Sequence, residues 1–241
     1  MSAIAIIPAR GGSKRIPRKN IMLLEGVPTI AYPINIAIES GLFDRVIVST
    51  DDKEIAELST KLGAEVPSLR TKELSDDFAV TTDVIADSVF NLKEKGNNYD
   101  FVCCIYPVTP LLRIERLKEA YKIIELGDWD YVFPAIEFSS PIERGFTKQE
   151  TGVIDFRFPE FAKTRTQDLN KTFHDAGQFY FGKFEAWLTK QPILTGNSTF
   201  IELDKYENFD VDNLSDWALV EKMVRLNKDN VLIIIYFYNL L

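Results

Sequence analysis

The sequence predicts an α/β fold in which a mostly parallel sheet carries helices on both faces. Short apolar runs alternate with longer helical segments through the first half of the chain, the pattern of repeated strand–helix units. A glycine-rich, basic segment follows the first run, at the sheet edge where open α/β sheets bind their ligands. The composition, 46% hydrophobic and 27% charged over 241 residues, is that of a globular protein with one sizeable domain.

Four strands are predicted in the first half of the chain, over residues 4–8, 45–50, 101–106 and 131–138. Helices are predicted over 28–39, from Asp51 onward, from Thr81 or Thr82 to about 95, and over about 113–126. Gly41 closes the first helix, in which Pro33 marks either a kink or the true start. Asp51 is expected to cap the second helix, with Glu54 completing a capping box.

The alternation breaks between residues 139 and 170, where prolines, glycines and phenylalanines gather. Alternation over 152–158 predicts a hairpin outside the main sheet, and aromatic surface on such an excursion favours a subunit interface. Regular structure resumes at 178–181, and Ser215 is expected to cap a helix over 216–226. We therefore expect a single domain over 1–228 with a dimerisation excursion at about 139–170. The apolar tail 229–241 has no assigned role.

The most informative segment is the basic turn directly behind the first strand. Its cations are Arg10, Lys14, Arg15, Arg18 and Lys19, although the chain as a whole carries a formal charge of −8. The paired glycines within this turn let the backbone approach an anion closely and point several N–H groups at it. Lysine and arginine side chains then neutralise phosphate charge. The segment predicts a polyphosphate site.

Two commoner phosphate loops are excluded by spacing. No lysine follows a glycine as a Walker loop requires, and after Gly12 the next glycine is Gly26, which excludes the dinucleotide-binding fingerprint. The alternative is a solvated surface charge run. It is disfavoured because the cations are interleaved with glycine, proline and asparagine instead of lying on one helical face.

Charge and cysteine usage narrow the class of partner. The acidic balance argues against nucleic acid, because binding a phosphate backbone requires a basic face. Cys103 and Cys104 point to opposite faces of a strand, so we expect buried thiols and neither a disulfide nor a metal pair. The absence of a disulfide framework and a signal peptide favours the cytoplasm. The apolar run 231–241 is shorter than the roughly 20 residues of a spanning helix, so no membrane partner is expected.

Asp210 and Asp212 are two residues apart. In an extended segment both carboxylates point to one side and reach one divalent cation, and Mg²⁺ prefers such oxygen ligands together with phosphate. The alternative is an acidic helix start, because Ser215 follows closely.

Two further polar segments each allow two interpretations. The loop from Arg70 to Thr81 either reads a base edge by hydrogen bonds or is an ordinary loop with a threonine cap. His174 is the only histidine, and it belongs either to a substrate pocket or to the structural framework.

Together these segments resemble the CMP-sialic acid synthetase, or acylneuraminate cytidylyltransferase, family over residues 3 to about 226. The resemblance is carried by residues 7–14 with Lys19-Asn20, 48–51, Leu69-Arg70, 106–110 and 210–212. Within the family, residues 103–107, 164–169 and 174–180 are similar to the pseudaminic acid branch. Sialate members tend to have Gln where Tyr106 stands and an Arg-Pro-Asn-Gly pattern at 174–177.

The resemblance implies a Rossmann-like nucleotide-diphospho-sugar transferase fold, a homodimer and Mg²⁺ dependence. It also implies that CTP and pseudaminic acid give CMP-pseudaminic acid and pyrophosphate, for surface glycan or flagellin glycosylation. CMP-N-acetylneuraminate and CMP-legionaminate synthesis are the alternatives within the family.

The resemblance also implies roles for individual residues. The residues that would bind the nucleotide are Ala9, Arg10, Gly11, Gly12, Ser13, Lys14, Lys19, Asn20, Arg70, Ala79 and Thr81, of which the last three would select cytosine. Sugar binding falls to Tyr106, Pro107, Thr109, Arg144, Arg165, Gln167, His174, Asp175, Gln178 and Tyr180. Asp210 and Asp212 would bind Mg²⁺, and Arg10, Lys19 and Asp210 would be catalytic. The excursion would lend Arg144 or Arg165 to the neighbouring subunit's site.

Two rival functions belong to other classes. A nucleotide-sugar glycosyltransferase also combines a Rossmann-like sheet with an Asp-x-Asp metal site, but there the carboxylates usually end a mid-chain strand. A nucleotide-sensing or assembly module would bind nucleotide without turnover.

Overall fold

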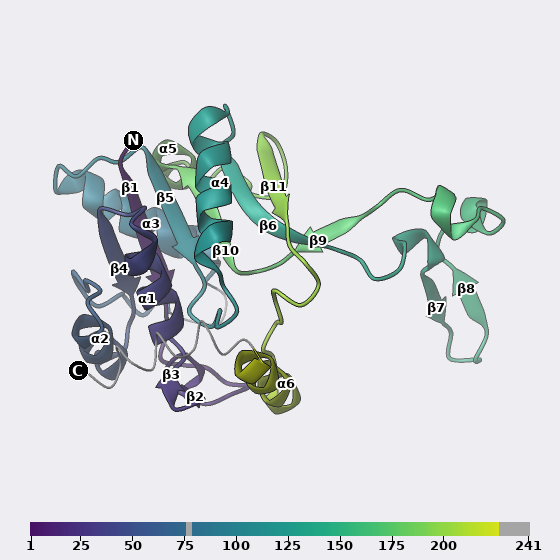
Figure 1. Ribbon diagram of the computed structural model, residues 1–241, viewed down its shortest axis with the longest axis horizontal. Helices are drawn as coiled ribbons and strands as arrows, with labels where there is room; N and C mark the ends of the chain where they lie inside the picture. The colour runs from purple at the N-terminus through teal and green to yellow at the C-terminus, as the bar shows by residue number, and fades with distance from the viewer. Residues whose placement is uncertain (76–78, 227–241) are drawn as a thin grey trace.

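The computed structural model describes residues 1–75 and 79–226, so the predicted tail at 229–241 lies outside the described residues. Its centre is a seven-stranded sheet with the order β11-β6-β10-β5-β1-β4 and with β9 paired to β6 (Figure 1). The strands are β1 (Ala3–Pro8), β4 (Arg45–Ser49), β5 (Phe101–Ile105), β6 (Tyr131–Glu137), β9 (Phe173–Asp175), β10 (Phe179–Lys183) and β11 (Ser198–Glu202). The helices are α1 (Ala31–Ser40), α2 (Lys53–Lys61), α3 (Thr81–Glu94), α4 (Ile114–Leu126), α5 (Phe184–Leu188) and α6 (Leu214–Leu226).

The predicted mostly parallel sheet is confirmed. β1 pairs in parallel with both β4 and β5, and β11 pairs in parallel with β6. β10 lies between β5 and β6 and is antiparallel to both, and β9 is antiparallel to β6. The direction of β10 could not be predicted from the sequence, because β10 is inserted between two strands, β5 and β6, that come from earlier in the chain.

Helices cover both faces of the sheet, as predicted. Alternate residues of β1 enter different cores: Ala5 and Ile7 pack on the side of α1, α4 and α6, whereas Ile4 and Ile6 pack on the side of α3 and α5. All four side chains are fully buried, and burying each isoleucine contributes about 1.5–3 kcal/mol. The same alternation separates the two buried thiols of β5 between the two cores, which confirms that Cys103 and Cys104 are buried and lie on opposite faces of the strand.

Three predicted helix starts need correction. Residues Val27–Pro28 form the short strand β3, which pairs with β2 (Leu23–Leu24), and α1 begins at Ala31 with Pro33 in its first turn, where a proline is tolerated. The cap of α2 is Asp52, whose Oδ1 accepts from the N–H of Ile55 at 3.0 Å. The Asn213 side chain, and not Ser215, accepts the N–H groups at the start of α6.

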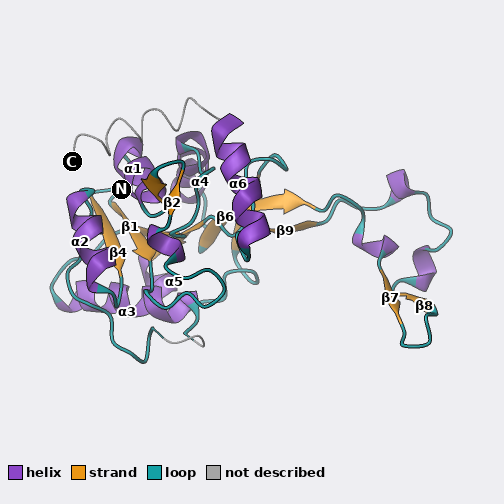
Figure 2. Ribbon diagram, turned by 90° about the horizontal axis from the view of Figure 1, so that it is seen from below, coloured by secondary structure: helices purple, strands orange, loops and turns teal. Residues whose placement is uncertain are grey.

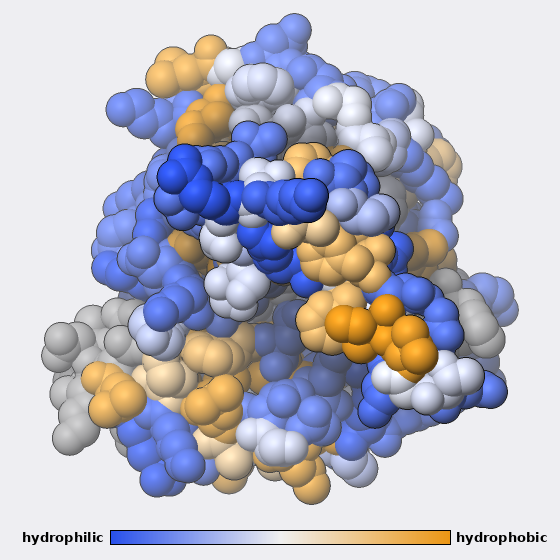
Figure 3. Space-filling model, turned by 90° about the vertical axis from the view of Figure 1, so that its right-hand side faces the viewer, coloured by the Kyte–Doolittle hydropathy of each residue, from blue (hydrophilic) through white to orange (hydrophobic). Residues whose placement is uncertain are grey.

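Residues 139–172 form an arm that projects away from the sheet between β6 and β9 (Figures 1 and 2). The predicted hairpin is present as β7 (Phe146–Lys148) and β8 (Ile154–Phe156), paired antiparallel outside the main sheet. Figure 3 looks at the molecule from the arm's side and shows hydrophobic side chains interspersed with hydrophilic ones. On the arm, Phe146, Val153 and Ile154 are each more than half exposed.

Within the described part of the chain, none of the helices combines the length and the apolar character that crossing a lipid bilayer requires.

Candidate active site

A cavity of about 570 Å³ opens where β1 and β5 end. It is lined by Pro8, Arg10, Ser13, Lys14, Arg15, Lys19, Asn20, Arg70, Leu74, Ala79, Thr81, Val84, Tyr106, Pro107 and Asp212. Eight of the eleven residues predicted to bind a nucleotide are among them, and the other three, Ala9, Gly11 and Gly12, belong to the same turn. The segments that follow β1 and β5 therefore converge on one site, because neighbouring parallel strands end at the same edge of the sheet.

Three hydrogen bonds hold the backbone of the basic turn, two of them from residues outside the cavity. The N–H of Ala9 donates to the carbonyl of Ser49 at 2.9 Å, and the N–H of Gly11 donates to Asp51 Oδ1 at 2.9 Å. Asn20 is buried, and its Nδ2 donates to the carbonyl of Arg10 at 2.8 Å. Asp51, expected to cap α2, instead fixes the turn to the end of the neighbouring strand.

Arg18 and Lys19 are adjacent in the sequence, but their side chains bind partners on opposite sides of the turn. Arg18 has a left-handed backbone, with φ of 57°, and its guanidinium pairs with Asp52 and Glu54, each at 2.5 Å. Glu54 therefore pairs with Arg18 in place of the expected capping box. Lys19 enters the cavity, where its Nζ donates to the carbonyl of Val211 at 2.7 Å.

The Asp210–Asp212 segment faces the basic turn across Lys19. Asp212 pairs with Arg15 at 2.8 Å, and both side chains are largely exposed. Burial raises the pKa of Asp210, and the negative charges of Asp212 and Asp175 raise it further. Burial lowers the pKa of Lys19, while the charges of Asp212 and Asp210 oppose that shift. Two carboxylates that repel each other are a donor set that a divalent cation would stabilise.

Arg70 separates the cavity from the surface behind β4. Its N–H donates to the carbonyl of Thr50 at 2.7 Å, and its Nη2 donates to the carbonyl of Ser49 at 3.2 Å. Burial lowers the pKa of its guanidinium, and the charge of Asp51 opposes that shift. These bonds fix Arg70 in the wall of the cavity, which Thr81 and Tyr106 also line.

The predicted sugar-binding residues fall into three groups. Tyr106 and Pro107 line the cavity, and Tyr180 and Asp175 lie behind Tyr106. Thr109 and Gln178 are buried framework residues: Thr109 Oγ1 donates to the carbonyl of Tyr106 at 3.0 Å, and Gln178 Nε2 donates to the carbonyl of Glu207 at 2.6 Å.

The remaining predicted sugar-binding residues lie outside this cavity. His174 is exposed and packs on Phe138, with 4.9 Å between the ring centroids. Arg144, Arg165 and Gln167 lie on the arm, where Arg144 donates to the carbonyl of Thr164 and Arg165 pairs with Asp168 at 2.8 Å.

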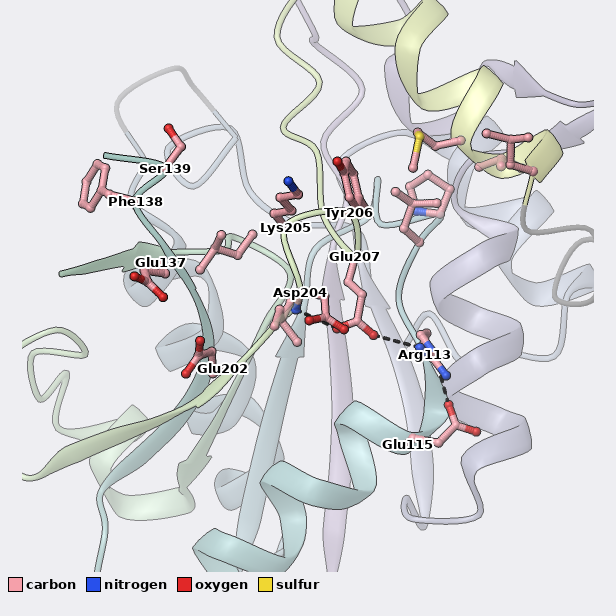
Figure 4. A pocket seen from close by; sticks show the side chains of 17 residues that line it. Arg113, Glu115, Glu137, Phe138, Ser139, Glu202, Asp204, Lys205, Tyr206 and Glu207 are labelled. Atoms are coloured by element: carbon pink, nitrogen blue, oxygen red, sulfur yellow. Dashed lines mark hydrogen bonds and ion pairs between the residues drawn. The ribbon is translucent and has the colours of Figure 1, made fainter. Parts of the chain in front are cut away.

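A larger cavity, of about 980 Å³, lies between α4, β6, β11 and α6 (Figure 4). Its charged lining has an acidic excess: Glu115, Glu137, Glu202, Asp204 and Glu207 outnumber Arg113 and Lys205. Glu207 is already paired with Arg113 at 2.9 Å and with Arg116 at 2.7 Å. The smaller cavity instead gathers five cations, Arg10, Lys14, Arg15, Lys19 and Arg70, against one carboxylate. A polyphosphate therefore fits the smaller cavity, although the other is wider.

Three features of the site were not predicted: Arg15 at the cavity rim, the apolar lining by Leu74 and Val84, and the outer brace made by Asp51, Asp52 and Arg18. The basic run contained Arg15 and Arg18, but spacing alone does not say which cations point inward. In the described parts of the chain, no group of three or more His, Cys, Asp or Glu side chains is arranged to hold a metal ion. Any metal at Asp210 and Asp212 therefore needs further ligands from a substrate or solvent.

Comparisons with known proteins agree with this geometry. Residues 4–177 match the sequence model of a family described as cytidylyltransferase. The chain is 41% identical over 230 residues to the pseudaminic acid cytidylyltransferase of Campylobacter jejuni, covering 95% of this chain and 99% of that protein. It is 30% identical over 237 residues to the CMP-N,N'-diacetyllegionaminic acid synthase of Legionella pneumophila, covering 95% and 99% respectively. Among solved structures, the chain is similar to a CMP:2-keto-3-deoxy-manno-octonic acid synthetase complexed with CTP, with a TM-score of 0.71. The two sequences are 14% identical, and the match covers 94% of this chain and 100% of that one. This last likeness shows a shared fold.

Proposed function

Because this chain belongs to the cytidylyltransferase family, we propose that it transfers CMP from CTP to pseudaminic acid and releases pyrophosphate. The observation that carries the proposal is the cavity where β1 and β5 end, in which five cations face an Asp-x-Asp segment across Lys19. The reaction consumes CTP, in keeping with the cytoplasmic location expected from the sequence.

In the proposed complex the triphosphate lies along the basic turn. Arg10, Lys14 and Lys19 neutralise its charge, and the Gly12 backbone, which has no Cβ, lets the phosphate oxygens come close to the turn. The cytosine base lies deeper, against Arg70, Ala79 and Thr81, where Leu74 and Val84 provide an apolar lining. The outer brace made by Asp51, Asp52 and Arg18 keeps the turn open before CTP arrives.

In the proposed reaction, the anomeric hydroxyl oxygen of the sugar attacks the α-phosphorus in line with the leaving group. A bond forms between that oxygen and phosphorus, and the bond from the α-phosphorus to the bridging oxygen breaks, so that pyrophosphate departs with the electron pair. Arg10 and Lys19 lie where they would stabilise the charge on the departing group. The hydroxyl loses its proton to a base as the new bond forms.

Asp210 and Asp212 would hold a divalent cation, which we propose to be Mg²⁺. The mutual repulsion of these carboxylates and their place beside the phosphate-binding turn fit a hard cation that takes its other ligands from phosphate and water. When bound, Mg²⁺ would withdraw charge from the α-phosphate and orient the sugar hydroxyl. Lys19 holds the intervening Val211 carbonyl and so fixes the two carboxylates relative to the basic turn.

The arm is the proposed dimerisation element. Phe146, Val153 and Ile154 are exposed on it, and a second copy of the chain would remove them from water. In such a homodimer, Arg144 or Arg165 of one protomer would reach the sugar pocket of its partner and pair with the sugar carboxylate. N-acetylneuraminic and legionaminic acids remain the alternative sugars.

The proposal is tested by comparing Lys19→Ala with the wild-type chain for pyrophosphate release from CTP and pseudaminic acid. Losing one preorganised charge contact should lower kcat/KM by roughly two to three orders of magnitude. The matched control is Lys53→Ala, an exposed lysine at the start of α2, which should retain wild-type turnover. Near-normal turnover by Lys19→Ala would overturn the assignment of the turn. Tight CTP binding by the wild-type chain without turnover would favour the nucleotide-sensing alternative.

A further inference from the structure

The two aspartates beside the cavity belong to residues 209–212, the carboxylate segment, which lies in the connection between β11 and α6. Phe209 packs against the core and Val211 is buried in it, whereas Asp210 and Asp212 are exposed. This alternation is that of an extended segment, in which residues two apart point to the same side. The apolar contacts therefore turn both carboxylates away from the core. Such contacts are not directional, so they do not fix where the segment stands along the cavity.

Directional bonds reach the start of the carboxylate segment from the turn between β9 and β10. Gln178 is buried in this turn, and its Nε2 donates to the carbonyl of Glu207 at 2.6 Å. In the opposite direction, Asn208 Nδ2 donates to the carbonyl of Ala176. Each stretch of chain thus gives one amide donor and one carbonyl acceptor. The two bonds join the stretches side by side immediately before Asp210.

The turn that gives these bonds is itself fixed to the wall of the cavity. The carbonyl of Gln178 accepts from the N–H of Tyr106, which lines the cavity, at 2.8 Å. Gly177 has a left-handed backbone with φ of 62°, and its N–H donates to Asp175 Oδ1 at 2.8 Å. The turn also lies against the carboxylate, because a Cβ added at Gly177 would be 3.4 Å from Asp210 Oδ1. Gln178 therefore bonds through its backbone to the end of β5 and through its side chain to the stretch that carries the carboxylates.

We propose that Gln178 and Asn208 are positioning residues: they hold Asp210 where it and the second carboxylate of the segment bind one divalent cation together. The inference rests on the proposed function, in which these carboxylates hold the cation. Lys19 holds the same segment from its other side. Without the two amide bonds, only Lys19 and apolar contacts would restrain the segment. The cation would then have to order both carboxylates itself, and that loss of conformational entropy lowers its affinity.

The test is calorimetric binding of CTP without sugar, measured over a series of Mg²⁺ concentrations, so that no turnover is needed. Asn208→Ala removes one amide donor, and Gln178→Met removes the other with little change in volume; neither changes the charge of the site. In each variant, the Mg²⁺ concentration that gives half of its effect on CTP affinity should rise by about tenfold. The affinity for CTP without Mg²⁺ should match that of the wild-type chain, because the basic turn is unaltered.

The matched control is Asn197→Ala, which should keep the wild-type Mg²⁺ dependence. Asn197 Nδ2 also donates to a backbone carbonyl, that of Asp128, but it precedes β11 at the opposite edge of the sheet from the cavity.

Two results would overturn the inference and leave the proposed function standing. One is a wild-type Mg²⁺ dependence in both Asn208→Ala and Gln178→Met. The other is a loss of CTP affinity without Mg²⁺ that is as large as the loss with Mg²⁺, which would show a general disturbance of the cavity. If Mg²⁺ has no effect on CTP binding by the wild-type chain, the result would instead contradict the proposed cation site itself.

Discussion

Replacing Gly11 with alanine tests whether the phosphate-binding turn is braced from outside the cavity. A Cβ at this position would lie 2.6 Å from Asp52 Oδ2 and 2.9 Å from Asp52 Cβ. The aspartate cannot simply turn away, because its Oδ1 caps α2 through Ile55 and its Oδ2 pairs with Arg18. Either the turn or the helix start must therefore move. At the neighbouring Gly12, an added Cβ meets nothing within 4 Å, which makes Gly12→Ala the matched control.

The expected size of the effect follows from these contacts. Relieving the overlap needs a displacement of roughly 1 Å, and losing the Asp52 cap costs about 1 kcal/mol. Overpacking adds about 1 kcal/mol or more. The partly exposed Arg18 pair adds little, because solvent screens it. We expect Gly11→Ala to lower the free energy of unfolding by about 2 kcal/mol, or roughly 4–8 °C in Tm for a domain of this size.

The assay is thermal unfolding without nucleotide, so that contacts with a bound phosphate do not contribute to the measured Tm. Asp52→Gly removes all three contacts closest to the added Cβ while keeping an acceptable helix cap, so Gly11→Ala should cost less in that background. Equal melting temperatures for Gly11→Ala and Gly12→Ala would refute the reasoning.

Three other predictions follow from the turn, the carboxylate pair and the arm. Arg18→Gly and Arg18→Ala lose the same ion pairs, but only the alanine variant has a Cβ that disfavours the left-handed backbone at φ 57°. The alanine variant should therefore be about 1 kcal/mol less stable than the glycine variant in chemical denaturation, and equal stability would contradict the backbone argument. Asp212→Ala should raise the Mg²⁺ concentration needed for half-maximal turnover. An unchanged Mg²⁺ titration would show that Asp212 does not bind the cation and that its role is the ion pair with Arg15. Ile154→Glu should halve the mass measured by analytical ultracentrifugation, and an unaltered mass would remove the hairpin from the interface.

Much of the fold could be predicted because apolar runs such as that of β1 are buried on both sides, which a near-continuous β-branched sequence indicates directly. The direction of β10 could not, because it depends on how the chain returns from the arm. The cap of α2 was misplaced by one residue for a physical reason. Two aspartates in a row satisfy the same local pattern, and only the fold shows that Asp51 binds the turn while Asp52 binds the helix.

The candidate site shows the same division between local and distant information. The glycine-rich turn indicated an anion site because its residue types suffice for that chemistry, and the structure gathers four of its five cations, all but Arg18, around one cavity. The contact between Thr81 and Tyr106 and the bond from Tyr180 to Asp175 could not be found from spacing, because each joins residues that are distant in the sequence or belong to different strands. The predicted roles of Arg144, Arg165 and Gln167 depend on a second protomer and stay predictions.

The measurement that tests the central claim most directly is pyrophosphate release from CTP and Mg²⁺, with pseudaminic, N-acetylneuraminic and legionaminic acids offered in parallel. We expect release with pseudaminic acid alone. Release with another of these acids would keep the reaction and overturn the choice of sugar. No release with any of them, despite CTP binding, would contradict the proposed transfer.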